Sequence, residues 1–316
     1  MFDSLNFRGE VKLFLKNELR QNKDAGTYLF YGDKGVDLLG LATSFTMAMN
    51  CPELENNYCG VCEVCKKIKY GSYADLEIIG LLQGESKVGI DKIKNIIYKA
   101  SSSSYEGRKK VFIIKDIESM NKYSANALLK IMEEPPKGTF FILISNTLNV
   151  LPTILSRSIV VKVDKSSAET LGVTEKVYNF FMGNMSEILE WKKERIDINE
   201  IKSYSALGEY LNVYLTEKNL KNKIDLLKGI DDYIHNIKRM KKSEKLSIIF
   251  ELLHILQDDK LIENKSHERK TIEELMHTFI VRLKIPEYTE KLIELKQSLR
   301  NNVNTQVALT LFFLSF

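Results

Sequence analysis

Hydrophobic positions along the first half of the chain switch repeatedly between two spacings. Residues 9–22, 38–48 and 89–100 carry apolar side chains at helical spacing, as Val11, Leu15 and Leu19 illustrate. Between them lie short apolar runs rich in β-branched and aromatic residues, at 28–31, 75–79, 110–114 and 139–145. Runs of this length and composition are typical of buried strands. The alternation predicts an α/β fold with a parallel sheet covered by helices on both faces.

The pattern changes beyond Val163, where strand runs fade and helical spacing with abundant Lys, Glu and Leu continues. One short helical segment reaches about residue 200 and a longer helical block follows to the end. A chain of 316 residues is long enough for two or three domains. We therefore predict an α/β domain over 1–163, a small helical domain over 164–200 and an all-α domain over 201–316.

The composition is that of an ordinary soluble protein, with 44% hydrophobic and 28% charged residues. The net charge of +4 is only mildly basic, so charge alone does not indicate a nucleic-acid partner. No apolar run approaches the length of about 18 residues that a membrane span requires, and the first residues lack a signal-peptide pattern. These features lead us to expect a cytoplasmic protein without a membrane partner.

A glycine-containing loop over 29–39, LFYGDKGVDLL, follows the first strand run and precedes a helix. This context is typical of a phosphate-binding loop, which reads G-x-x-x-x-G-K-[ST]. Gly32 and Gly35 keep the rhythm, but Asp37, Leu38 and Leu39 stand where glycine, lysine and a hydroxyl residue bind the phosphates and Mg²⁺. An acidic side chain and two leucines would leave a phosphate without a partner, so we predict that this loop binds no nucleotide.

All cysteines of the chain fall in one short segment with the spacing C-x7-C-x2-C-x2-C: Cys51, Cys59, Cys62 and Cys65. In a reducing compartment, four clustered thiols favour a closed tetrahedral zinc site over disulfides. The histidines lie far downstream, and four cysteine ligands leave no open position for a catalytic water. We predict a structural Zn²⁺ site, with Gly60 allowing a tight turn; unliganded thiols are the alternative.

Further motifs occur at 105–114 (YEGRKKVFII), 124–136 (SANALLKIMEEPP) and 151–158 (LPTILSRS). Together with the loop and the cysteines, they resemble the clamp-loader branch of the AAA+ proteins, most closely the δ′ (delta-prime) subunits of bacterial DNA polymerase III. The resemblance covers about the first 160 residues, and residues 302–309 are similar to the family's last collar helix. It implies a RecA-like AAA+ domain with a zinc-binding insertion, a small helical lid and a helical collar.

The resemblance also identifies positions that normally complete a nucleotide site. Lys115 stands where the family carries a carboxylate for Mg²⁺, and it is followed by Asp116. A lysine cannot ligate a cation, although Asp116 could take over the role. A loose alignment places Glu187 where ATP-binding relatives carry a sensing arginine. With the altered loop, these departures imply a chain that binds no ATP and is not itself an enzyme.

Arg157, within Ser156-Arg157-Ser158, matches the S-R-C motif of the family. In relatives this arginine acts in trans as a finger on nucleotide bound by the adjacent subunit, where it stabilises charge on the transferred phosphoryl group. Serine replaces the usual cysteine at Ser158. The alternative interpretation of Arg157 is an ordinary arginine at a helix end.

The resemblance implies a δ′-like stator of the replicative clamp loader, which supplies Arg157 to a τ/γ-type ATPase within a hetero-pentamer. A δ-type subunit would be a further partner, the sliding clamp an indirect one, and contact with primer-template DNA stays open. Two alternatives are an ATP-binding motor subunit of the same loader and a zinc-dependent nucleic-acid binding module.

Overall fold

A computed structural model of the chain describes residues 5–82, 87–102, 104–106, 108–237, 239–256 and 265–283, together with positions 290, 293–295, 297 and 307. The chain forms two compact units, Met1–Leu189 and Glu190–Phe316. Within the described parts, no helix combines the length and apolar character needed to cross a bilayer. The finer division at residues 163 and 200 stays a prediction.

The first unit is built on a parallel sheet with the strand order β2-β3-β4-β1-β5. Its strands are β1 Gly26–Tyr31, β2 Leu76–Ile79, β3 Lys110–Ile114, β4 Thr139–Ser145 and β5 Ile159–Lys162. Every residue of β3 and β4 is buried, as expected for central strands with helices on both faces. The predicted α/β fold with a parallel sheet is confirmed.

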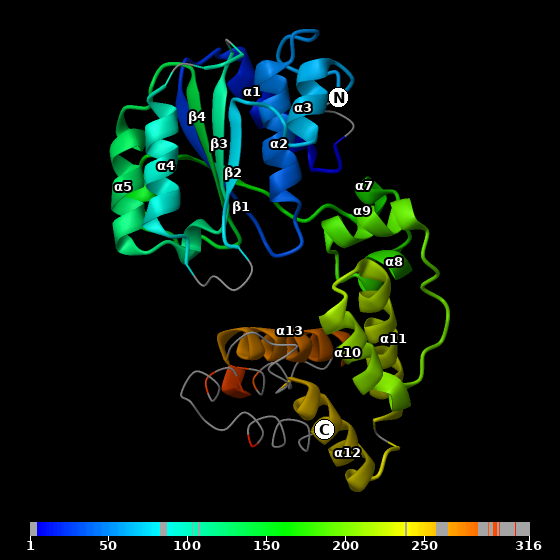
Figure 1. Ribbon diagram of the computed structural model, residues 1–316. Coiled ribbons are helices and arrows are strands. Elements are labelled where there is room, and N and C mark those ends of the chain that lie inside the picture. The colour runs from blue at the N-terminus through cyan, green and yellow to red at the C-terminus, as the bar shows by residue number, and fades with distance from the viewer. Residues whose placement is uncertain are drawn as a thin grey trace. The chain divides into compact units, whose positions relative to one another are not determined.

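Helices cover both faces of this sheet (Figure 1). The unit contains α1 Gly9–Arg20, α2 Leu38–Asn50, α3 Glu63–Lys69, α4 Ile90–Ala100, α5 Lys122–Glu133, the short α6 Pro152–Leu155, α7 Ala168–Leu171 and α8 Glu175–Phe180, and α9 Met185–Glu194 runs across its boundary. Leu29, Phe112 and Phe141 pack in one core with residues of α4 and α5. On the other face, the Phe45 ring of α2 packs edge-on against Tyr28, with ring centroids 5.1 Å apart.

The strand β5 and the helix α3 are among the elements of this unit that were not predicted. β5 has only four residues, and two of them are exposed, because it forms the edge of the sheet. Its apolar run therefore lacks the continuous buried character that marks β3 and β4. The helix α3 begins within the cysteine segment, where the Cys62 side chain accepts a hydrogen bond from the Cys65 N–H and caps it.

A buried carboxylate fixes the segment that enters β3. Asp75 is 2% exposed, and it accepts hydrogen bonds from the backbone N–H groups of Tyr105 (2.9 Å) and Glu106 (2.8 Å). Asp75→Ala leaves two backbone donors without this acceptor, which is expected to lower the free energy of unfolding by about 1–3 kcal/mol. Urea unfolding measures the loss. Asp24→Asn, at an exposed carboxylate, is the control and is expected to change stability by less than about 1 kcal/mol.

The second unit is helical in its described part. It contains α10 Leu207–Thr216, α11 Leu220–Asn236, α12 Lys242–Leu256 and α13 Lys265–Leu283. Leu211, Ile230, Tyr233 and Phe279 contribute to one apolar core in which these helices pack. The helical C-terminal block is thus confirmed for these residues, whereas the predicted last helix over 302–309 lies outside the described residues apart from position 307.

Candidate functional site

The glycine-containing loop connects β1 to α2 at the carboxyl end of the sheet, the edge at which open α/β sheets bind ligands. The Gly32 N–H donates to the carbonyl of Ser145, the last residue of β4, at 3.3 Å. Asp37 is the N-cap of α2, and its carboxylate accepts a hydrogen bond from the Gly40 N–H at 2.9 Å. A helix N-terminus attracts anions because its N–H groups are unpaired and its dipole is positive. Here a side-chain carboxylate of the chain itself binds at that position.

The rest of the loop is held against neighbouring backbone. The Gly35 carbonyl accepts a hydrogen bond from the Met185 N–H at 2.7 Å. Gly35 has a φ of +92°, and a Cβ added there would lie 3.0 Å from Cα of Asn184. Leu38, which stands at the lysine position of the motif, is 3% exposed. The loop therefore contacts Asn184 and Met185 at the start of α9, and a buried leucine stands where the motif has its lysine.

The end of β3 carries Lys115 and Asp116 at the position expected for a Mg²⁺ ligand. Lys115 continues the β2–β3 pairing through a hydrogen bond from its N–H to the Ile79 carbonyl (2.8 Å). Asp116 adopts a left-handed φ of 57°, and its Oδ2 atom accepts a hydrogen bond from the Leu81 N–H at 3.1 Å. The Asp116 carboxylate thus contacts the backbone that leaves β2.

Glu187, where the resemblance places a sensing arginine, has a structural role in α9. Its N–H donates to Oδ1 of Asn184 at 3.2 Å, and its carboxylate accepts a hydrogen bond from the Asn184 side-chain amide. Asn184 thus caps α9 by accepting the backbone N–H of Glu187, and its side-chain amide in turn donates to the Glu187 carboxylate. The contact explains why an acidic residue suits this position.

The four cysteines converge into one cluster, in which their Sγ atoms all lie within 4.8 Å of one another. A tetrahedral zinc site with Zn–S bonds of about 2.3 Å places sulfur atoms about 3.8 Å apart, so the cluster fits one ion after small side-chain adjustments. Backbone N–H groups point at the sulfurs: Cys59 N–H to Cys51 Sγ (3.4 Å), Cys62 N–H to Cys59 Sγ (3.2 Å) and Cys65 N–H to Cys62 Sγ (3.4 Å). The predicted tight turn is present, with a φ of 76° at Gly60.

The thiols differ in their proton affinity. Hydrogen bonds from the backbone N–H groups of Val61 and Cys62 lower the pKa of the Cys59 thiol to about 7. Burial raises the pKa of the Cys65 thiol above its ordinary value. A bound divalent cation would hold all four as thiolates, so the donor set suits a closed structural site.

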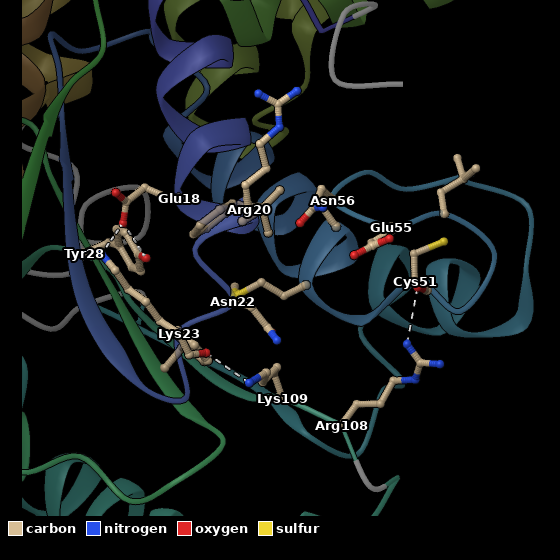
Figure 2. A pocket seen from close by; sticks show the side chains of 16 residues that line it. Glu18, Arg20, Asn22, Lys23, Tyr28, Cys51, Glu55, Asn56, Arg108 and Lys109 are labelled. Carbon is tan, nitrogen blue, oxygen red and sulfur yellow. Dashed lines mark hydrogen bonds and ion pairs between the residues drawn. The ribbon is translucent and has the colours of Figure 1, made fainter.

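The cysteine cluster is anchored to the amino end of the sheet. Figure 2 shows Arg108 reaching the Cys51 carbonyl, where its Nη1 donates at 3.3 Å, and Lys109 reaching the Lys23 carbonyl at 3.0 Å. These residues line a cavity of about 220 Å³ between the cysteine segment and the corner that joins α1 to β1. The cations therefore serve as links between backbone segments in this cavity.

Arg157 follows α6 and is held by several acceptors. Its Nε and Nη2 both donate to Oε1 of Glu133, the Nε bond being 2.9 Å long. Its Nη1 donates to the Thr153 carbonyl (3.2 Å) and to Oγ of Ser156 (3.3 Å). The Arg157 side chain keeps 33% of its surface exposed. Ser156 thus contacts the Arg157 guanidinium through its hydroxyl, and Glu133 is a further contact that the Ser156-Arg157-Ser158 motif did not indicate.

Comparison with known proteins supports the family. A family model described as "DNA polymerase III, delta subunit" matches residues 8–167, half of the 316-residue chain. The chain belongs to this clamp-loader family of AAA+ proteins. The chain is 34% identical to DNA polymerase III subunit tau/gamma of Haemophilus influenzae over 145 residues. The matched region is 45% of this chain and 21% of that protein.

The similar proteins include delta' subunits as well as tau/gamma subunits. The chain is 31% identical over 137 residues to subunit delta' of Pseudomonas aeruginosa, covering 43% of this chain and 42% of that protein. The chain therefore matches less than half the length of either relative. A gamma subunit-related protein of Thermotoga maritima has the same fold, with a TM-score of 0.62, 18% identity and coverage of 96% and 97% of the two chains.

Proposed function

We propose that the chain is a δ′-like stator subunit of the bacterial clamp loader, which binds no nucleotide and lends Arg157 to a neighbouring ATPase subunit. The observation that carries this proposal is the Asp37 carboxylate at the N-terminus of α2, where a bound triphosphate would require an unoccupied anion site. A second carboxylate or phosphate at this position would meet like charge in a partly dry environment.

The contacts of the loop and of β3 support the same proposal. The hydrogen bond between Gly35 and Met185 fixes the loop against the first residue of α9. Asp116 accepts a hydrogen bond from the Leu81 N–H and so supports the backbone after β2, a structural role that accounts for this carboxylate without Mg²⁺. A subunit without a nucleotide-dependent state has no differential binding energy with which ATP could move it, so it would serve as a fixed surface for moving neighbours.

The partners follow from the same reasoning. A τ/γ-type ATPase would receive the guanidinium of Arg157, a δ-type subunit would complete a hetero-pentamer, and the helical second unit would contribute to the collar. We propose one structural Zn²⁺ held by Cys51, Cys59, Cys62 and Cys65, with no role in hydrolysis. The chain and its partner subunits would act in the cytoplasm, during sliding-clamp loading.

A motor subunit of the same loader is the second candidate, because the chain is 34% identical to a tau/gamma relative over 145 residues. A zinc-dependent nucleic-acid module is the third, and it requires tight, salt-sensitive DNA binding by the chain alone. The stator proposal expects such binding to be weak.

Binding of Mg·ATP to the isolated chain separates stator from motor. At about 1 mM ATP, a dissociation constant of about 10 μM would stabilise the fold by about 2.7 kcal/mol, a shift of several degrees in the unfolding midpoint. We expect a shift below about 1 °C, measured by thermal unfolding and by calorimetric titration. The variant Asp37→Asn keeps a side-chain acceptor for the Gly40 N–H but removes the negative charge. We expect that it still does not bind ATP, because Leu38 stands at the position of the lysine. Micromolar affinity of the unaltered chain would favour the motor subunit.

A further inference from the structure

The contacts of Arg157 leave little of its guanidinium available. Nη1 is used by the Thr153 carbonyl and Ser156 Oγ, while Nε and Nη2 share one oxygen of Glu133. A guanidinium has five N–H donors in a rigid fork. The edge formed by Nε and Nη2 is the one that binds carboxylate or phosphate in a two-point manner, and in this structure Glu133 holds it.

Helix stability does not explain an acidic residue at the position of Glu133. Glu133 is the last residue of α5, and the carboxyl end of a helix carries partial negative charge that disfavours an anion. Glu133 is separated from Arg157 by 24 positions, and its side chain is 51% exposed. The residue is therefore better accounted for by its contact with Arg157 than by the helix to which it belongs.

The exposure of the pair sets how easily it can open. An ion pair that is accessible to water contributes little net free energy, because solvent screens the charges and competes for their hydrogen bonds. A nucleotide triphosphate presents several anionic oxygens, and Arg binds phosphate through the same edge that it offers to a carboxylate. The Glu133 carboxylate and a phosphate are therefore competitors for one guanidinium edge.

We propose that Glu133 is a positioning residue that holds Arg157 in a resting state and yields it when the neighbouring subunit binds a nucleoside triphosphate. This inference rests on the proposed role of Arg157 as a finger in trans. In this resting state the Glu133 carboxylate fixes the orientation of the guanidinium. It also occupies the edge that would otherwise bind other anions. Part of the free energy with which the neighbouring subunit binds the triphosphate is then used to separate Arg157 from Glu133.

Steady-state hydrolysis by the assembly of this full chain with its ATPase partners tests the proposal, with Mg·ATP as the probe. Glu133→Gln removes the charge that competes with phosphate, so KM for ATP is expected to fall about two- to fivefold, the range of an exposed ion pair. Because Arg157 is still present in the transition state, kcat is expected to stay within about twofold. Glu134→Gln is the matched control, since it removes the same charge one residue away, and both constants should be unchanged.

Other outcomes separate the possible failures. An unchanged or higher KM for Glu133→Gln overturns the resting state, and so does a fall in kcat with constant KM, which would mean that Glu133 only orients the arginine. Arg157→Ala in the same assembly tests the finger itself. If that variant hydrolyses ATP at the normal rate, the proposed function fails; if it is slow while Glu133→Gln is normal, only the resting state fails.

Discussion

Arg157→Ala is expected, under the proposed function, to slow hydrolysis at the ATP site of the neighbouring subunit on the order of 10³-fold, because a finger in trans stabilises charge on the transferred phosphoryl group. The side chain is 33% exposed and already oriented by Ser156 and Thr153, so its removal costs little folding energy. Single-turnover hydrolysis by the assembled loader measures the effect. The fast phase should lose the amplitude of the site that receives Arg157.

Arg20→Ala is the matched control for this prediction. Arg20 ends α1, is exposed and contacts Asn17 through a hydrogen bond of 3.4 Å, so its loss removes the same charge from a different helix end. Size-exclusion chromatography establishes that both variants still assemble. A normal fast-phase amplitude for Arg157→Ala in an intact assembly would contradict the proposed function.

Elements with strong local signals were predictable from the sequence. The strands β3 and β4 are continuous apolar runs and are buried along their whole length, and burial on both faces produces such runs. β5 was missed because an edge strand of four residues alternates between buried and exposed positions. The helix α3 was missed because Cys62 and Cys65 were interpreted only as metal ligands, whereas Cys62 is also the residue that caps the start of this helix.

Sequence spacing could indicate that site residues lie together in space only where those residues are also close in the chain. The cysteines do, and the structure brings their sulfurs together. The contacts of Gly35 with Asn184 and of Arg157 with Glu133 join segments that are distant in sequence. Such pairs depend on how strands and helices pack, and no periodicity within either segment records them. The local feature that permits this close approach is Gly35, whose φ of +92° is one that glycine adopts without strain.

The largest stability effect is expected for Cys62→Ser. A structural zinc ion contributes about 10–16 kcal/mol to the folding of small zinc-binding peptides, so loss of one of four ligands should cost the first unit several kcal/mol. Cys62 also accepts the Cys65 N–H and caps α3, and serine is a favoured N-cap residue, so the loss of stability should come from the missing metal ligand. We expect the metal content to fall from about one equivalent to a small fraction, and the unfolding midpoint to drop by at least about 5 °C.

The position of the cluster determines how far this damage should spread. Arg108 donates to the carbonyl of Cys51, the residue that ends α2, so disorder in the cysteine segment releases a contact at the entry to β3. Hydrogen exchange should therefore quicken over residues 51–70 and at the start of β3, while α10 and α11 in the second unit stay protected. Lys69→Ala, an exposed change on α3, is the control and should retain metal. An unaltered chain that contains no metal and whose four thiols titrate freely would contradict the zinc site, and the cluster would then be held by its backbone hydrogen bonds alone.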